Sequence, residues 1–271
     1  MTQTYITDGG YRFILATTNE RASTNWVFLP GGPGLGSEYY SPLIELLDLP
    51  GSVWRCDFPG DGSNTSDSNT EFDKWDERLP LALATLGNVI LVGHSFSGMF
   101  ILTVPEVEKH LSGLVLMDTA IDHHWRDGIL ERARAQGIEN DDEYWKIRKA
   151  THDNASLKRA ALAGWYYYMS AGVKEQALAL LSPLPFNYKS FIWAQEQFHP
   201  TFEAQWIPET IPTLILSGSE DMLTPIDFFK NDTRFHRDNI QLSEIPGGSH
   251  YPWMEEPEAV KRIFKKFCDQ L

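Results

Sequence analysis

Short apolar runs alternate with longer amphipathic stretches along the first 118 residues of the chain. Runs of four or five mostly apolar residues are typical of buried strands and are too short for helices. The expected strands are 26–29, 53–57, 89–92 and 113–117, and helical patterns follow them at 39–47, at 72–86 and after Ser95. Upstream, two short runs flank Asp8-Gly9, which indicates a hairpin. Strands that alternate with helices predict an α/β fold with a mostly parallel sheet.

The alternation breaks at residue 119 and resumes at residue 212. The intervening segment reads as helices at 127–135, 142–150, 156–171 and 174–181. Two further apolar strands are expected at 213–217 and 240–245, and a helix with Pro257 in its first turn follows them. We therefore expect one α/β core built from residues 1–118 and 212–271, with a helical insertion formed by residues 119–211.

Composition and charge narrow the possible partners. The 271 residues are 42% hydrophobic and carry a net charge of −14, so the chain can bury a core but repels phosphate backbones and anionic membranes. No apolar stretch is long enough to span a bilayer. Cys56 and Cys268 have no metal-ligand spacing and are expected as free thiols. The first residues do not resemble a secretory signal, so a cytoplasmic location is expected.

A serine with small neighbours lies where one expected strand turns into a helix. Residues 93–98 read Gly-His-Ser-Phe-Ser-Gly, with Ser95 in third place. Small residues on both sides of this serine allow the helix to cross close to the strand. Such a turn projects the hydroxyl from the end of a sheet, as in a nucleophile elbow. Ser95 is therefore the candidate nucleophile.

Two more chemical groups follow later strands. Asp221 comes just after the strand at 213–217, and His250 comes just after the strand at 240–245. Ligands of open α/β sheets bind at the carboxyl ends of the strands. A nucleophilic serine needs a histidine base, and that base needs an acid to orient it. Asp118 also ends an expected strand and is the alternative acid.

A glycine-rich loop follows the strand at 26–29. Four of the six residues at 31–36 are glycines, so a substrate can approach the backbone closely. In acyl transfer such a loop supplies N–H groups to the developing oxyanion. We expect the N–H of Gly32 and the N–H of Phe96, the residue after the nucleophile, to be the two donors.

Together these segments resemble the α/β-hydrolase superfamily, and within it the enzymes with an HGGPG-type oxyanion loop, which include prolyl aminopeptidases and related esterases. The matching pieces span most of the chain outside the insertion: 31–34, 57–63, 93–98, 221–225 and 249–258. The resemblance implies an eight-stranded, mostly parallel sheet flanked by helices. It also implies that residues 119–211 form a lid after the sixth strand.

The resemblance assigns roles to the candidate residues. Ser95 is then the nucleophile, His250 the general base and later the acid, and Asp221 the group that orients His250. Asp221 is favoured over Asp118 because Thr-Pro follows it at 224–225 in the family manner.

The chain departs from the family pattern at three places. Pro30 stands where the loop usually has histidine, and Ser97 stands where the elbow usually has glycine. The loop at 57–63 is of the general esterase type and lacks the basic residue of prolyl aminopeptidases.

We therefore expect a serine hydrolase that cleaves a carboxylic ester through an acyl-Ser95 intermediate, with no cofactor or metal. A prolyl-type aminopeptidase is the alternative, with Glu143, Glu175 or Glu196 binding the substrate amino group. A C–C bond hydrolase or a non-catalytic small-molecule receptor of the same fold also remains open, as does the oligomeric state.

The insertion contributes candidate substrate contacts. It holds five of the nine tryptophans, and we expect Trp125, Trp165 and Trp193 to bind an apolar or aromatic group of a small-molecule substrate. The alternative is that these rings pack the insertion onto the core.

Overall fold

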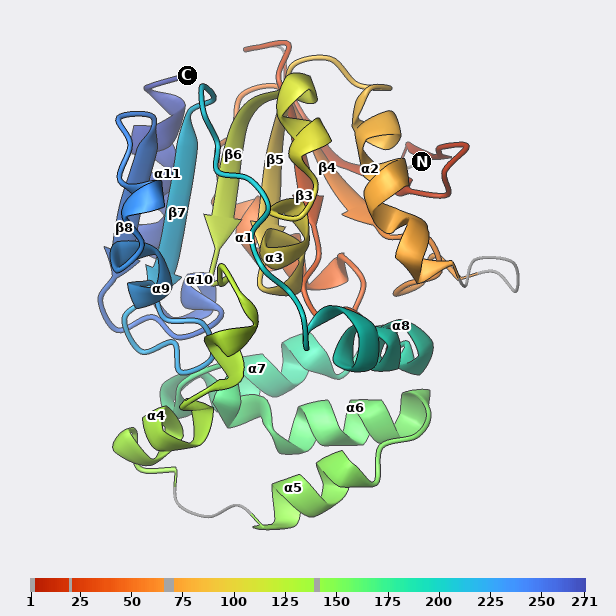
Figure 1. Cartoon of the computed structure of the whole chain (residues 1–271), viewed down its shortest axis with the longest axis vertical. Helices are drawn as coiled ribbons and strands as arrows, with labels where there is room; N and C mark the ends of the chain where they lie inside the picture. The colour runs from red at the N-terminus through yellow and green to blue at the C-terminus, as the bar shows by residue number, and fades with distance from the viewer. Residues whose placement is uncertain (1–2, 20, 66–70, 139–141) are drawn as a thin grey trace.

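The computed structural model describes residues 3–19, 21–65, 71–138 and 142–271. Eight strands form one sheet in the order β1-β2-β4-β3-β5-β6-β7-β8 (Figure 1). The pairs β1–β2 and β2–β4 are antiparallel, and the remaining pairs are parallel. The strands are β1 (Thr4–Ile6), β2 (Arg12–Thr18), β3 (Asn25–Leu29), β4 (Ser52–Asp57), β5 (Val89–His94), β6 (Leu111–Met117), β7 (Thr213–Gly218) and β8 (Ile240–Ile245). The predicted fold class is confirmed.

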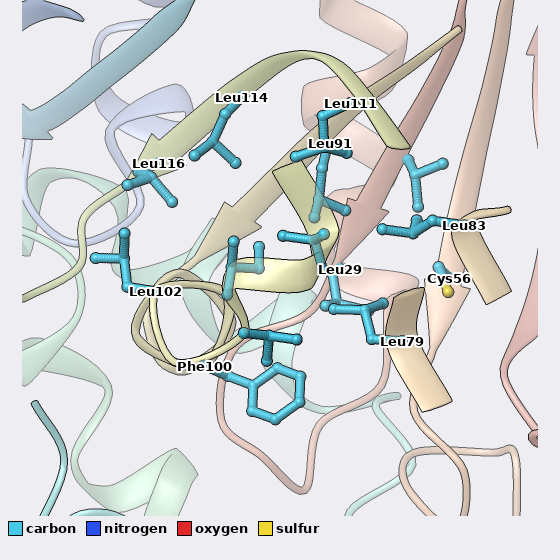
Figure 2. Packing of buried hydrophobic residues seen from close by; sticks show 14 of the residues in the cluster. Leu29, Cys56, Leu79, Leu83, Leu91, Phe100, Leu102, Leu111, Leu114 and Leu116 are labelled. Atoms are coloured by element: carbon cyan, nitrogen blue, oxygen red, sulfur yellow. The ribbon is translucent and has the colours of Figure 1, made fainter. Parts of the chain in front are cut away.

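Helices cover both faces of the sheet because the strand residues alternate between two apolar clusters. On β3, Val27 and Leu29 belong to the cluster that contains residues of α2 (Trp75–Leu83) and α3 (Phe96–Ile101). Figure 2 shows leucines of β3, β5 and β6 packed against these two helices. The opposite face packs against α1 (Ser41–Leu46), α10 (Pro252–Glu255) and α11 (Pro257–Cys268). The short helix α9 (Asp227–Lys230) follows β7.

A helical insertion separates β6 from β7. Figure 1 shows its helices beyond the arrowheads of the parallel strands, which is the edge of the sheet where Ser95 lies. Its helices are α4 (Ile129–Ala135), α5 (Asp142–Lys149), α6 (Asn154–Ala163), α7 (Lys174–Leu181) and α8 (Tyr188–Trp193), with a π-helical turn, η7, at Ala194–Phe198. Among the described residues, no helix has the length and apolar character needed to cross a membrane.

One predicted helix of the insertion is shorter than expected. The pattern at 156–171 predicts a single helix, but α6 ends at Ala163 and the chain continues in 3-10 turns. Gly164 follows α6, and a Cβ at this position would lie 2.3 Å from a ring carbon of Tyr144. The close approach of α5 at this point therefore requires glycine, which weakens the helix that the apolar periodicity predicts.

Candidate active site

Ser95 occupies a strained turn between β5 and α3. Its backbone angles are φ 55° and ψ −121°, a conformation that L-residues rarely adopt and that turns the strand sharply into the helix. A Cβ on Gly98 would lie 2.6 Å from the hydroxyl oxygen of Thr119, so only glycine allows α3 to pass this close to the segment that follows β6. The Thr119 hydroxyl donates to the carbonyl of Ser95 at 2.7 Å. The turn is thus held from the segment that follows the neighbouring strand.

Ser97, which stands where the family pattern has glycine, is integrated into the turn. Its hydroxyl donates to the carbonyl of Leu29 at 2.6 Å and accepts the N–H of His94 at 2.9 Å. The side chain is fully buried, and its hydrogen bonds, including a longer one of 3.1 Å to the carbonyl of His94, are all to backbone groups. Ser97 therefore ties the turn to β3 through a contact that glycine cannot make.

Ser95, His250 and Asp221 form a continuous series of hydrogen-bonded side chains. The Nε2 of His250 lies 2.9 Å from the Oγ of Ser95, and its Nδ1 lies 2.9 Å from the Oδ2 of Asp221. Thr224 donates its hydroxyl to the same Asp221 oxygen at 2.8 Å, while the N–H groups of Leu223 and Thr224 bind Oδ1. The three residues come from the ends of β5, β7 and β8.

The surroundings of Asp221 stabilise its charge. Burial opposes ionisation, but the charge interaction with His250 and the hydrogen bonds from His250 and Thr224 outweigh it, so the pKa of Asp221 lies below its usual value. An ionised carboxylate at this position can hold the Nδ1–H of His250 and leave Nε2 free to accept a proton from Ser95.

Asp118, the alternative acid, lies near Asp221 but is not bonded to His250. Its Oδ1 accepts the N–H of Gly218 at 2.9 Å, and its Oδ2 has no hydrogen-bond partner among the described residues. Burial, and then the charge of Asp221, raises the pKa of Asp118 well above its usual value. Asp118 therefore fits a buried, protonated neighbour of the site better than the partner of His250.

His94 and Tyr39 connect the turn to the glycine-rich loop. The Nε2 of His94 lies 2.8 Å from the carbonyl oxygen of His250, which can only accept, so Nε2 carries the proton. Its Nδ1 then accepts from the Tyr39 hydroxyl at 3.0 Å, and the Tyr39 oxygen accepts the N–H of Gly31 at 2.6 Å. Burial, and then the proximity of His250, lowers the pKa of His94 well below its usual value. Sequence reasoning missed Tyr39, because nothing in the local pattern marks this contact across the fold.

The glycine-rich loop is fixed on both sides of Gly32. Tyr39 holds Gly31, and the N–H of Gly34 donates to Oδ2 of the buried Asp61 at 3.0 Å. Within the described residues, the N–H groups of Gly32 and Phe96 have no hydrogen-bond partner. Pro30 stands where the family pattern has histidine, and in this chain Tyr39 and Asp61 hold the loop.

A cavity of about 440 Å³ opens onto Ser95, His250 and Gly32. Much of its lining comes from the insertion, including Trp125 and Trp145. The cavity therefore places the hydroxyl of Ser95 against a mainly apolar chamber, as expected for a site that binds an apolar or aromatic group.

Trp165 and Trp193 lie outside this lining, contrary to the expectation for substrate contacts. The Trp193 ring packs 5.1 Å from the Trp75 ring of α2, measured between centroids. The Trp165 ring lies under the ammonium group of Lys174, at 5.7 Å from its centroid. Trp193 therefore packs the insertion onto the core, and Trp165 packs within the insertion. Tertiary packing decides which side chains of the insertion face the cavity, and the local sequence does not show it.

The described cavity lining contains no carboxylate. Glu175 and Glu196, two of the residues expected to bind an amino group in an aminopeptidase, are absent from it, and the side chain of Glu143 lies outside the described residues. The charged groups that do line the cavity are the guanidinium groups of Arg126 and Arg148. Nowhere in the described part of the chain do three His, Cys, Asp or Glu side chains gather as a metal site.

Comparisons with known proteins agree with this architecture. "Putative esterase/lipase 2" of Mycoplasma pneumoniae is 24% identical over 274 residues, which cover 96% of this chain and 95% of that protein. An α/β-fold hydrolase from Bacillus anthracis superposes with a TM-score of 0.74 at 13% identity, covering 98% of this chain and 99% of its own. A proline iminopeptidase-related protein from Thermus thermophilus superposes with a TM-score of 0.71 at 17% identity, over 100% and 98% of the two chains.

The family model described as "Alpha/beta hydrolase family" matches residues 26–263, which include β3 to β8 and every candidate site residue. The chain therefore belongs to the α/β-hydrolase family.

Proposed function

We propose that the protein hydrolyses a carboxylic ester through an acyl intermediate on Ser95. The observation that carries this proposal is the series of two 2.9 Å contacts that runs from Asp221 through His250 to the Ser95 hydroxyl at the cavity wall. This arrangement activates a serine without a cofactor or metal.

In the proposed reaction, His250 accepts the proton of Ser95 as the oxygen attacks the acyl carbon. The N–H groups of Gly32 and Phe96, which have no partner among the described residues, stabilise the oxyanion. His250 then protonates the departing alcohol, and a water molecule activated by His250 releases the acid from Ser95. Asp221 keeps the imidazole in the required tautomer throughout.

We also propose that residues 119–211 act as a lid over a core of residues 1–118 and 212–271. Trp125, Trp145 and other side chains of this segment line the cavity, so its position controls which small molecules reach Ser95. An ester with an apolar or aromatic portion suits the mostly apolar wall.

The charges of the cavity favour an ester over a peptide with a free amino terminus. Aminopeptidase action requires a group that attracts a cationic amine, but the described lining holds Arg126 and Arg148 and no carboxylate. A cationic amine placed between two guanidinium groups is repelled. The esterase/lipase name of the Mycoplasma pneumoniae relative points in the same direction.

Replacement of Ser95 by alanine tests the proposal. Ser95→Ala should lower kcat for p-nitrophenyl butyrate by about 10⁴-fold or more while circular dichroism stays unchanged, because no other group can form the acyl intermediate. Ser182→Ala, at an exposed serine that follows α7, should retain full activity. Activity above a tenth of the wild-type rate in purified Ser95→Ala would rule the mechanism out.

A further inference from the structure

The cavity beside Ser95 has the opposite charge to the rest of the protein. The chain has 37 acidic and 23 basic residues, yet the described cavity lining includes two arginines and no acid. Arg126 and Arg148 are both partly buried, and a partly desolvated guanidinium gains from a nearby counter-ion. Two such groups at one apolar wall therefore indicate an anion as their ligand.

Arg126 has no acidic partner among the described residues, although acids flank it in the sequence. Its Nη2 donates to the side-chain oxygen of Gln195 at 2.9 Å, a neutral acceptor. The flanking acids are turned away: Asp122 accepts the N–H of His124, and Asp127 contacts the His124 ring at 2.9 Å. No described carboxylate forms an ion pair with Arg126, and burial, followed by the proximity of Arg148, lowers its pKa.

Arg148 reaches the same cavity from a different helix. It lies near the end of α5, and its guanidinium carbon is 4.3 Å from the centroid of the Phe191 ring of α8. This stacking holds the planar group in place, and the Tyr144 side chain, one turn back on α5, is a further and neutral partner of the guanidinium. No described carboxylate is paired with Arg148 either.

Two neutral polar groups beside these arginines also have no hydrogen-bond partner in the part of the chain that the structure describes. His199 is 2% exposed, lines the cavity, and has an Nδ1 with no hydrogen-bond partner among the described residues. The indole N–H of Trp125 is likewise buried without a described partner, and its ring lies 5.2 Å from that of His199. Burial, followed by the charges of Arg126 and Arg148, lowers the pKa of His199 to about 3, so this ring is neutral and can donate.

The π-helical turn η7 contributes to this arrangement. Gln195 lies within it and His199 follows it directly, and both line the cavity. Turns of this kind occur often at functional sites because the extra residue redirects side chains. The polar wall of the cavity is therefore formed jointly by the segment that contains Trp125 and Arg126, by α5 and by η7.

We propose that the substrate is an ester that also carries a free carboxylate, which Arg126 and Arg148 bind while the Trp125 N–H and the His199 ring supply further hydrogen bonds. This inference rests on the proposed ester hydrolysis. A guanidinium fork matches the two oxygens of a carboxylate, and the remaining apolar wall receives the carbon skeleton between the carboxylate and the scissile ester. The carboxylate can belong to the acyl part or to the alcohol part of the ester.

Paired substrates test the proposal and distinguish these two sources. Mono-p-nitrophenyl adipate and its methyl ester carry the charge, or its neutral replacement, on the acyl side. Likewise, 4-butyryloxybenzoate and its methyl ester carry it on the alcohol side. The wild-type protein should prefer the charged member of at least one pair by about 10-fold or more in kcat/KM, the scale of one charge-assisted hydrogen bond. Equal rates, or a preference for both neutral esters, would overturn the proposal.

Arginine variants assign any preference to this wall. Arg126→Gln and Arg148→Gln should each lower kcat/KM for the preferred charged ester by about 10-fold to 10²-fold, with a clearly smaller loss on its neutral partner. For the charged ester, the kcat/KM of Arg126→Lys should lie between those of the wild type and Arg126→Gln, because lysine keeps the positive charge but cannot bind both carboxylate oxygens as the planar guanidinium does. Arg134→Gln, an exposed arginine of α4, should change neither rate. A preference that survives both glutamine variants would contradict the assignment.

Binding to the Ser95→Ala variant separates this inference from the proposed reaction. Titration with adipate monomethyl ester and with 4-butyryloxybenzoate, followed by tryptophan fluorescence, reports on Trp125 and Trp145 without any catalytic step. At least one carboxylate ligand should bind about 10-fold more tightly than its fully esterified form, and the gain should disappear in the Arg126→Gln background. If charged and neutral forms bind equally, the carboxylate site is wrong even where ester hydrolysis stands. If carboxylates bind to this variant but the wild-type protein cleaves no ester, the proposed reaction is wrong and the carboxylate site stands.

Discussion

Two buried aspartates beside His250 differ because their hydrogen-bond partners differ. Asp221 receives two backbone N–H groups, the Thr224 hydroxyl and the ring of His250, so its pKa is lowered. Asp118 receives the backbone N–H of Gly218 and lies beside the charge of Asp221, so its pKa is raised. At this scale, the number of donors and the sign of the nearest charge decide which aspartate can orient the histidine.

Asp61 makes the stability of the fold depend on pH. Burial is the largest influence and raises its pKa from 3.8 to about 6, despite hydrogen bonds from Ser190 and Gly34. Its carboxyl group is therefore more easily ionised in the unfolded chain, and its contribution to stability is full below pH ~4 and is lost as the pH rises through ~6.

Asp61→Asn should remove this dependence. The free energy of unfolding of the wild type, measured relative to the variant by urea denaturation, should fall by about 2–2.5 kcal/mol between pH 4 and pH 7.5, because each unit of pKa shift is worth about 1.36 kcal/mol and the unfolded carboxyl is already partly ionised at pH 4. The comparison with the variant cancels the titration of all other groups. A difference that stays constant across this range would mean that Asp61 is ionised in the folded protein at low pH.

At the scale of elements, the site depends on how closely α3 and the glycine-rich loop pack against the ends of the strands. The serine turn needs α3 to pass Thr119, just beyond the end of β6, without a side chain at Gly98, and the loop needs an anchor on each side of Gly32. Both requirements concern the position of the backbone rather than that of a side chain. In the local sequence they are visible only as small residues.

Gly98→Ala should destabilise the fold by about 1–3 kcal/mol, the usual cost of overpacking a close contact. The added methyl would lie 2.6 Å from the Thr119 hydroxyl oxygen and force α3 away from the segment that follows β6. Gly87→Ala is the matched control, because a Cβ there meets nothing within 4 Å. Urea denaturation measures both variants, and equal stability of the two would refute the close crossing.

Tyr39→Phe should lower kcat for p-nitrophenyl butyrate by about 10-fold to 10²-fold with a smaller effect on KM, since small misplacements of catalytic groups have effects of this size. The change removes the acceptor of the Gly31 N–H and the donor to His94. Tyr11→Phe is the control: it also loses a buried hydroxyl, which bonds the carbonyl of Trp75 instead. A similar kcat for both variants would show that the loop needs no support from Tyr39.

At the scale of the whole molecule, the alternation of strands and helices along the chain and the strand ends at which the candidate residues lie could be predicted from the sequence. Central strands of a parallel sheet are buried on both faces and appear as short apolar runs, and Ser95 and Asp221 each follow one of them. His250 follows β8, a partly exposed strand in which apolar and polar residues alternate. The structure brings these three residues together from positions up to 155 residues apart.

The walls of the cavity could not be predicted in the same way. Trp125 lines it, whereas Trp165 and Trp193 face other parts of the protein, because the rotation of each insertion helix is set by its packing partners. The same reason hides Arg126 and Arg148, which read in the sequence as ordinary surface charges. Long-range packing therefore decides the features that govern specificity, while local patterns decide the fold.

The central claim is that the fold activates Ser95, and covalent labelling tests it most directly. The purified protein is incubated with a fluorophosphonate, and the adduct is located by mass spectrometry of the intact protein and its peptides. We expect one adduct per chain, on Ser95, and its loss in the His250→Ala variant, because the imidazole 2.9 Å from the serine oxygen removes the proton. A folded protein that remains unlabelled, or that is labelled equally without His250, would contradict the account.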